Sequence, residues 1–264
     1  MQTRTTATEG GAVRAALRGA ALSYRALFTW FNPLGYLSSR IVRPIGMAIA
    51  FTSLATHYGA GAGRMLIASS LLAGAGAVVY GMALAVGNER SFDTLGVWLA
   101  SPQNKIAATC QRALPHVVDG FVGGLCTYLV CSLLYTTLPI SIPAYAALLA
   151  VGVLTTAGFG LSIAALALLL KDLFVGPNTA ELVLMVLSGT LVPQDRLPGF
   201  LVPLSTAMPL SHVMDAVDNL LAERAYGAPL MTELVIGTAW ALAGVVFVHL
   251  AARRATARLA LGTS

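Results

Sequence analysis

Charged residues are scarce in this chain. Only 10% of its 264 residues are charged, 57% are hydrophobic, and the mean hydropathy is +0.78. This composition excludes a water-soluble globular domain. No side chain between Asp119 and Lys171 carries a formal charge, and this run is far longer than the ~20 apolar residues that one helix needs to cross a bilayer. It therefore predicts at least two membrane spans, separated by residues 136–143.

The sequence also lacks the patterns of enzyme active sites and metal sites. Its cysteines lie in or beside one apolar run without CxxC spacing, which predicts small, reduced core residues. Its histidines are scattered and show no HExxH or other ligand spacing, and the sequence has no GxSxG. We therefore expect no catalytic residue and no metal site. The residues considered were Cys110, Cys126, Cys131, His57, His116, His212, His249 and the segment Gly160-Leu161-Ser162-Ile163-Ala164.

A phosphate-binding loop is missing as well. The pattern GxxxxGK[ST] needs a lysine after a glycine, whereas the only lysines, Lys105 and Lys171, follow Asn104 and Leu170. We expect no cofactor in this chain. If ATP drives its function, the ATP and its magnesium ion bind to another chain.

Long apolar runs favour membrane-spanning helices. A chain in lipid must satisfy its backbone internally, so it forms helices or a closed barrel, and the apolar runs do not alternate as barrel strands do. We predict an all-α membrane protein whose six transmembrane helices occupy residues 36–252. The spans are expected at about 36–56, 65–86, 113–135, 144–170, 174–192 and 231–251.

Shorter segments flank and interrupt the predicted spans. Residues 1–12 read as a flexible cytoplasmic N-terminus and residues 253–264 as a cytoplasmic tail. Arg14, Arg18 and Arg25 share one face of the segment 13–31, which predicts an amphipathic interfacial helix; a solvated basic helix is the alternative. Prolines punctuate residues 193–224, whose apolar pieces are too short to cross, so we expect a re-entrant hairpin of half-helices. Within it, Asp215 and Asp218 are expected to face water.

Basic residues are distributed unevenly over the two predicted sides. Of the sixteen, only Arg64, Arg196 and Arg224 fall on the side away from the termini. The excess of basic residues on the other side predicts that both termini are cytoplasmic and that the re-entrant hairpin is extracellular. Many alanines and glycines, with arginine far above lysine, indicate a bacterial inner membrane protein.

The polar segment 87–105 lies between the second and third predicted spans. Glu89, Arg90 and Asp93 precede an apolar pattern that Pro102 ends, which predicts one or two helical turns within residues 88–102. We interpret this segment as a docking helix for a second protein. A loop helix that merely rests on the bilayer is the alternative.

Two acidic residues occur within predicted spans, where a charge costs about 3 kcal/mol on insertion scales. Asp119 shares a helical face with His116, which favours a structural pair near the cytoplasmic surface over a proton relay. Glu181 follows Pro177-Asn178 and fits a first helical turn. If that helix starts at Leu173, Glu181 instead lies deep enough to line a transport path or to pair across a dimer.

The order of these segments resembles that of the type-2 ABC exporter permeases. Glu89-Arg90, Thr94-Leu95 and Pro102 are similar to that family's coupling segment, ER..GTLE...P, although Asp93 and Gly96 replace its usual glycine and glutamate. The hairpin is similar to its second signature, SG..FP..LP...P(L)(T/S)H. The residues that carry this second similarity are Ser188, Gly189, Pro193, Leu197, Pro198, Pro209 and His212. The drug and antibiotic exporters of the daunorubicin-resistance kind are the subgroup that it resembles most.

The resemblance implies a half-transporter. Two permeases, either two copies or a sister pair, would bind two cytoplasmic ABC ATPase subunits. The coupling helix would carry Glu89, Arg90, Phe92, Asp93, Thr94, Leu95 and Trp98, with Phe92, Leu95 and Trp98 as apolar anchors. The second and fifth spans would line the translocation path. Glu181 is a candidate path residue, and Gly81, Met82, Met185 and Ser188 are candidate wall residues for which core packing is the favoured alternative.

The sequence thus predicts the permease of an ABC exporter, which moves a hydrophobic or amphipathic drug, antibiotic or lipid out of the cytoplasm or inner leaflet. The alternative is an ATP-independent carrier or channel. A carrier is expected to show inverted repeats with matched broken helices, and the sequence shows only one such break, within residues 193–209.

Overall fold

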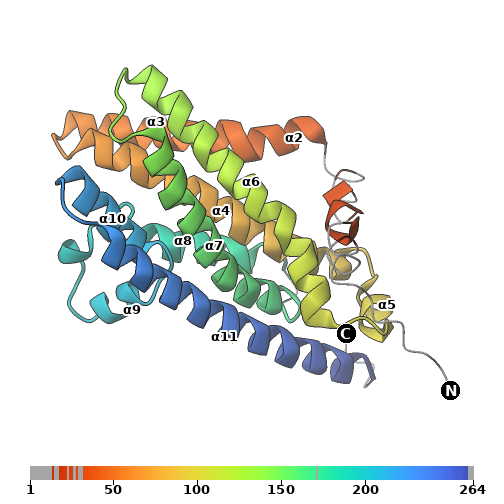
Figure 1. The fold of residues 1–264 in the computed structure, drawn as a ribbon. Helices are drawn as coiled ribbons and strands as arrows, with labels where there is room; N and C mark the ends of the chain where they lie inside the picture. Colours follow the sequence, from red (N-terminus) through yellow and green to blue (C-terminus); the bar gives the residue numbers. More distant parts are fainter. Residues whose placement is uncertain are drawn as a thin grey trace.

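The computed structural model describes residues 14, 18–22, 24–25, 28, 32–170 and 172–260 (Figure 1). Its regular elements are helices that pack side by side as a bundle. The predicted N-terminal segment 1–12 lies outside the described residues, as does most of the predicted interfacial helix 13–31. Of the latter, residues 18–22 and 24–25 are helical.

The first membrane-length helix is built from three consecutive pieces. The helix α2 (Pro33–Leu37) passes into the π-helical turn η1 (Ser38–Val42) and then into α3 (Arg43–His57), and the junction residues keep right-handed helical backbone angles. The wide turn directly precedes Pro44, whose ring would otherwise clash with the carbonyl of Arg40. A π-turn relieves such a clash, because its hydrogen bonds reach one residue further back.

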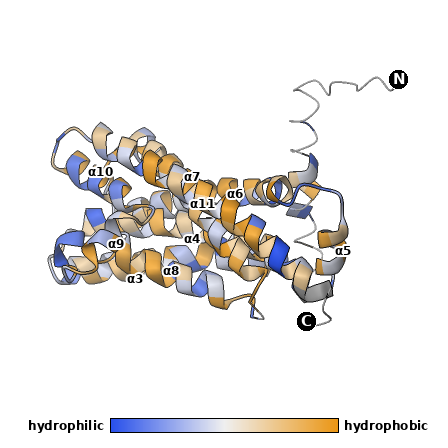
Figure 2. Cartoon of the chain, turned by 90° about the horizontal axis from the view of Figure 1, so that it is seen from below, coloured by the Kyte–Doolittle hydropathy of each residue, from blue (hydrophilic) through white to orange (hydrophobic). Residues whose placement is uncertain are grey.

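Among the described residues, four helices are long and apolar enough to cross a membrane. They are α4 (Ala62–Ser91), α6 (Lys105–Leu134), α7 (Ile142–Ala167) and α11 (Gly227–Ala260). Figure 2 shows hydrophobic residues along most of the bundle and more hydrophilic segments towards its two ends. The shorter helix α8 (Val175–Leu187) is apolar and packs against α4 and α7.

Glycines allow the long helices to approach closely. A Cβ added to Gly74 would lie 2.8 Å from the Gly120 carbonyl oxygen, so α4 and α6 touch through their backbones there. On α7, a Cβ at Gly158 would lie 2.7 Å from the carbonyl oxygen of Gly237 on α11. Such contacts are typical of helices packed in lipid, where dispersion rather than the hydrophobic effect holds neighbours together.

The connections gather at the two ends of the bundle. One end carries α5 (Leu95–Ala100), residues 168–170 and 172–174 and the C-terminal part of α11. The opposite end carries the loops 58–61 and 135–141, the short turn η2 (Gln194–Arg196), α9 (Val202–Thr206) and α10 (Ser211–Leu221) (Figure 1). We refer to these as the α5 end and the α10 end.

Several helices differ in length from the predicted spans. The helix α4 begins at Ala62, before the second predicted span at 65–86, and continues to Ser91. It ends where Asp93 adopts a left-handed backbone with φ 55°, a conformation that aspartate tolerates better than most residues. The helix α11 starts at Gly227 and continues through residues 253–260, which were expected to belong to the tail. The helix α8 is shorter than the span expected over 174–192.

Candidate functional site

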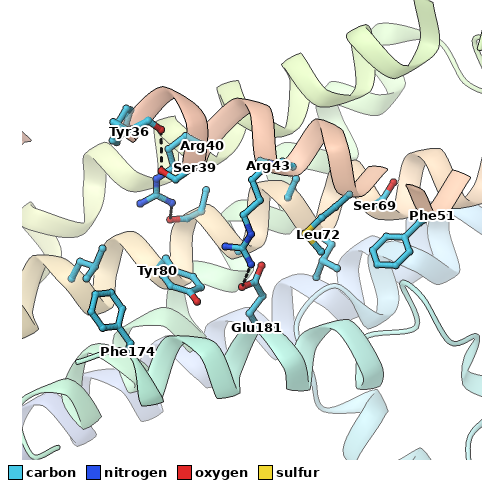
Figure 3. Close-up of a pocket in the computed structure, with 16 residues that line it drawn as sticks. Tyr36, Ser39, Arg40, Arg43, Phe51, Ser69, Leu72, Tyr80, Phe174 and Glu181 are labelled. Atoms are coloured by element: carbon cyan, nitrogen blue, oxygen red, sulfur yellow. Dashed lines mark hydrogen bonds and ion pairs between the residues drawn. The ribbon is translucent and has the colours of Figure 1, made fainter. Parts of the chain in front are cut away.

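A cavity of about 210 Å³ opens between α2–α3, α4 and α8. Its long axis follows the helices, from Tyr36 and Phe174 nearer the α5 end to Phe51 and Ser69 nearer the α10 end (Figure 3). Sixteen residues line it: Tyr36, Ser39, Arg40, Arg43, Pro44, Met47, Phe51, Ser69, Leu72, Ala73, Gly76, Ala77, Tyr80, Leu84, Phe174 and Glu181.

Charged side chains from the continuous helix α2–η1–α3 and from α8 line this cavity. Arg43 donates to Glu181 across 3.4 Å, which joins α3 to α8. Arg40 donates to the carbonyl oxygen of Ala77 on α4 at 2.8 Å, and its guanidinium lies 5.7 Å from the Tyr36 ring centre. Glu181 stands six residues after the first residue of α8, or about 9 Å along the helix. It therefore lies beyond the first helical turn, and its carboxylate faces the cavity.

The other residues expected along the path occupy different places. Gly81 faces α6, because a Cβ there would lie 2.2 Å from the His116 ring. Met82 is buried against Gly160 of α7. Ser188 is fully buried and donates to the carbonyl oxygen of Leu184, and Met185 packs at the edge of the core. Of the five, Glu181 is the one whose side chain lines the cavity.

Asp119 is the centre of a second polar cluster, within α6. Its Oδ1 accepts a hydrogen bond from the Tyr24 hydroxyl at 2.9 Å, and its Oδ2 accepts one from the Tyr36 hydroxyl. The His116 Nδ1 lies 3.6 Å from Oδ2, too far for a hydrogen bond. The cluster links the residues before α2 to α2 and α6. The hydrogen-bond partners of Asp119 are thus two tyrosines that the sequence did not single out, whereas His116, the expected partner, lies beside the cluster without a hydrogen bond to it.

The coupling segment has a buried and an exposed side. Leu95 and Trp98 are 7% and 6% exposed, whereas Phe92 is 51% and Val97 is 75% exposed. The Trp98 ring lies beneath two cations, with Lys105 Nζ 5.4 Å and the Arg112 guanidinium carbon 5.9 Å from its centre. Leu95 and Trp98 therefore fasten α5 to its own bundle.

Polar contacts hold the two ends of this segment. Glu89 at the end of α4 pairs with Arg112 of α6 and accepts a hydrogen bond from the Thr94 hydroxyl. Arg90 donates to the carbonyl oxygen of Leu170 at 2.7 Å. At the other end of α5, Lys105 donates to the carbonyl oxygen of Trp98 at 2.8 Å. These bonds fix the position of α5 relative to α4 and α6.

The residues of the second signature build the α10 end. Gly189 has φ +75°, a conformation that favours glycine, and Pro193 precedes η2. The segment through Leu197 and Pro198 is extended before α9, and Pro209 precedes the turn into α10. These residues reverse the chain twice at this end of the bundle.

Glu233 of α11 is a site residue that the sequence reasoning missed. Its side chain is completely buried, and its carboxylate accepts from Thr155 Oγ1 at 2.7 Å, Leu210 N at 2.9 Å and His212 N at 3.1 Å. It thereby caps the N-terminus of α10 where Leu210 holds a strained φ of 72°. A lone glutamate just inside the last apolar run was the signal that could have revealed it.

Asp215 and Asp218, which were expected to face water, are partly exposed and also form ion pairs at the α10 end. Arg64 binds Asp218 through two nitrogens at 2.6 and 3.1 Å and also donates to the Gly189 carbonyl oxygen at 3.0 Å. His212 Nδ1 lies 3.0 Å from an Asp215 carboxylate oxygen. That hydrogen bond is the largest influence on the histidine and raises the pKa of His212, against the opposing effect of burial.

The chain is similar in sequence to one family of membrane transporters. The ABC-2 type transporter family matches residues 20–221, a range that contains α2 to α10. No curated protein and no solved structure matches the chain significantly. The family match spans more than half of the chain and both segments that resembled type-2 exporters. The chain therefore belongs to the ABC-2 type transporter family.

Proposed function

We propose that this chain is the membrane permease of an ATP-driven exporter and that a separate ABC ATPase powers it. The match to the ABC-2 type transporter family carries the proposal. The chain has no phosphate-binding loop of its own, and α5 presents exposed apolar side chains at one end of the bundle. Substrate export therefore needs an ATPase that docks at that end.

In this proposal the chain spans the membrane six times. The four long helices supply four spans. The continuous helix α2–η1–α3 supplies the first, since its 25 residues from 33 to 57 are long enough to cross ~30 Å. The helix α8 together with its flanking apolar residues supplies the fifth. The α10 hairpin then forms the extracellular re-entrant element, held by Glu233 and Arg64.

Basic residues support the orientation. Arg90, Lys105, Arg112, Arg253 and Arg254 lie towards the α5 end, whereas Arg64, Arg196 and Arg224 lie at the α10 end. This excess supports a cytoplasmic location for the α5 end. There α5 meets the ATPase, in a complex of two permeases and two ATPase subunits in a bacterial inner membrane.

The exposed side of the coupling segment is the proposed docking face. Phe92 and Val97 provide its apolar area, and Asp93 lies between α4 and α5. Leu95 and Trp98, which the sequence assigned to the same anchoring role, transmit force to the spans instead, because they are buried against them. ATP-driven movement of the ATPases would thus rock α4 and α6 through α5.

Copurification of the ATPase tests this function. The tagged chain is purified gently from its native membrane, and its stoichiometric companions are identified by mass spectrometry. Phe92→Glu and Val97→Glu should each reduce the recovery of a Walker A-containing ATPase by about tenfold or more, the effect of losing an interface hot spot. The matched control is Phe200→Glu, because Phe200 is 80% exposed at the opposite end.

Two outcomes would contradict the proposal. Retention of the ATPase by both Phe92→Glu and Val97→Glu would show that docking occurs elsewhere. Absence of any ATPase, together with substrate movement in vesicles without ATP, would favour an ATP-independent carrier.

A further inference from the structure

We infer that the cavity between α2–α3, α4 and α8 binds a single-chain amphiphile with an anionic head group. The inference rests on the proposed function for its orientation, and it names the class of ligand that the cavity accepts. Three observations support it. Cationic side chains outnumber anionic ones in the wall, their N–H donors are not all used, and the charged side chains lie in one part of the cavity.

The wall contains more cationic than anionic side chains. Arg40 and Arg43 face Glu181, so guanidinium groups outnumber carboxylates two to one among the lining residues. Asp119 lies nearby, but its oxygens are held by Tyr24 and Tyr36 and it does not line the cavity. An anionic group entering the cavity therefore meets a surplus of positive charge.

Arg43 pairs loosely with Glu181 and also interacts with the Tyr80 hydroxyl. Its contact with Glu181 measures 3.4 Å, and its side chain is 55% exposed, whereas strong guanidinium–carboxylate bonds measure ~2.7–2.9 Å. Each guanidinium has five N–H donors. The described contacts of Arg43 and of Arg40 use fewer donors than this. Both arginines therefore keep N–H donors beyond these contacts, and a phosphate or carboxylate in the cavity can accept bonds from them while Arg40 remains bonded to Ala77.

The charged side chains are confined to one part of the cavity. Arg40, Arg43 and Glu181 lie nearer the α5 end, where the apolar Phe174 also lies, whereas the uncharged Leu72, Ser69 and Phe51 line the portion nearer the α10 end (Figure 3). Tyr36 and Phe51 are fifteen residues apart on one helix, or about 22 Å. With the α5 end in the cytoplasm, this polarity matches an inner-leaflet amphiphile whose chain points to the bilayer centre.

The size of the cavity favours a narrow ligand. Its volume of about 210 Å³ lies below the ~300–1,000 Å³ of typical pockets for small molecules. Ala73 and Ala77 add little side-chain bulk to the wall, whereas the Glu181 carboxylate lies 3.3 Å from a Cβ built on Gly76 and narrows the cavity there. The remaining width favours one alkyl chain. A fused polycyclic ring system would require the helices to separate.

Ligand titration of the full chain tests the inference without any ATPase. The chain, in a nonionic detergent, is titrated by native mass spectrometry with dodecyl phosphate, dodecyltrimethylammonium, dodecyl maltoside and inorganic phosphate. Dodecyl phosphate should bind one to one and at least tenfold more tightly than the other three. Tighter binding of the ammonium probe, or equal binding of all dodecyl probes, would overturn the inference.

Three variants separate the ligand site from general damage. Arg43→Gln should weaken the binding of dodecyl phosphate about tenfold, the usual effect of losing a hydrogen bond to a charged group. Glu181→Gln should strengthen it, since a competing carboxylate disappears, and a misfolded protein would not show this gain. Arg253→Gln removes an exposed arginine of α11 outside the cavity and should change nothing. Equal losses in Arg43→Gln and Arg253→Gln would refute the site.

A competition measurement identifies the source of the anionic ligand. The titration is repeated in nanodiscs of phosphatidylcholine with and without phosphatidylglycerol. Competition by phosphatidylglycerol assigns the site to a membrane lipid, and its absence assigns the site to exported cargo; both outcomes presuppose the anionic selectivity. Failure of the ATPase copurification would leave these binding results intact, so the two proposals can fail separately.

Discussion

Replacement of Gly158 by alanine probes the contact between α7 and α11. The added Cβ would lie 2.6 Å from Ala241 N and 2.7 Å from the Gly237 carbonyl oxygen, whereas ordinary contacts measure 3.4–4 Å. Both neighbours are backbone atoms, which cannot rotate away. The two helices must therefore separate locally by about 0.8 Å, a gap that forfeits roughly a quarter to a half of each affected dispersion contact.

The magnitude follows from two opposing effects. Overpacking against backbone should cost ~3 kcal/mol, the upper part of the usual range, and the higher helix propensity of alanine returns up to ~1 kcal/mol. The net loss of about 2 kcal/mol lowers the midpoint of thermal unfolding by about 4–8 °C for a chain of this size. Gly46→Ala is the matched control, because a Cβ at Gly46 meets nothing within 4 Å.

Tryptophan fluorescence during heating in detergent provides the assay. Trp240 of α11 packs edge-to-face on Phe159 of α7, with ring centres 4.8 Å apart, so its emission reports on this contact. Gly46→Ala should unfold at or slightly above the temperature of the unmodified chain. If Gly158→Ala unfolds at the same temperature as Gly46→Ala, the close backbone approach of α7 and α11 is refuted.

Three further predictions concern the α10 end. Glu233→Leu should destabilise the chain by about 3 kcal/mol or more in thermal unfolding, because two backbone N–H donors lose their acceptor. Glu233→Gln keeps one acceptor oxygen and should destabilise the chain less. Equal losses would contradict the capping role. The contribution of His212 to stability should be full below about pH 6.5 and should decrease as the pH rises through its raised folded pKa. Asp215→Asn should flatten this dependence when unfolding is measured between about pH 5.5 and 8.5. An unchanged profile would disprove the pairing. A double-mutant cycle of Arg64→Gln and Asp218→Asn should give a coupling energy of ~1 kcal/mol, and strictly additive effects would rule the pair out.

Hydrophobicity alone determined the class of the protein. Because lipid offers the backbone no hydrogen-bond partners, long uncharged runs can only become helices or barrel strands, and the apolar runs leading to α4, α6, α7 and α11 admitted only helices. Proline and polar residues likewise revealed α5 and the α9–α10 hairpin. The resemblance to ABC exporters, drawn from the order of these segments, agrees with the family that the chain belongs to.

Which face of a helix meets which neighbour was decided only by the tertiary structure. The spacing of Leu95 and Trp98 defined an apolar stripe on α5, but the same stripe can serve a partner protein or the chain's own bundle, and packing selected the bundle. Gly81 and Met82 could not be assigned to path or core for the same reason.

Polar contacts between distant residues also required the fold. Arg64 and Asp218 are 154 residues apart in sequence, and Glu233 reaches α10 from another helix. Neither pairing leaves a local pattern, because side-chain spacing along one helix fixes only neighbours three or four residues away. The sequence by itself determined the helices and their order along the chain. The tertiary structure determined which buried charges meet, since a charge in lipid is stable only where another element supplies its partner.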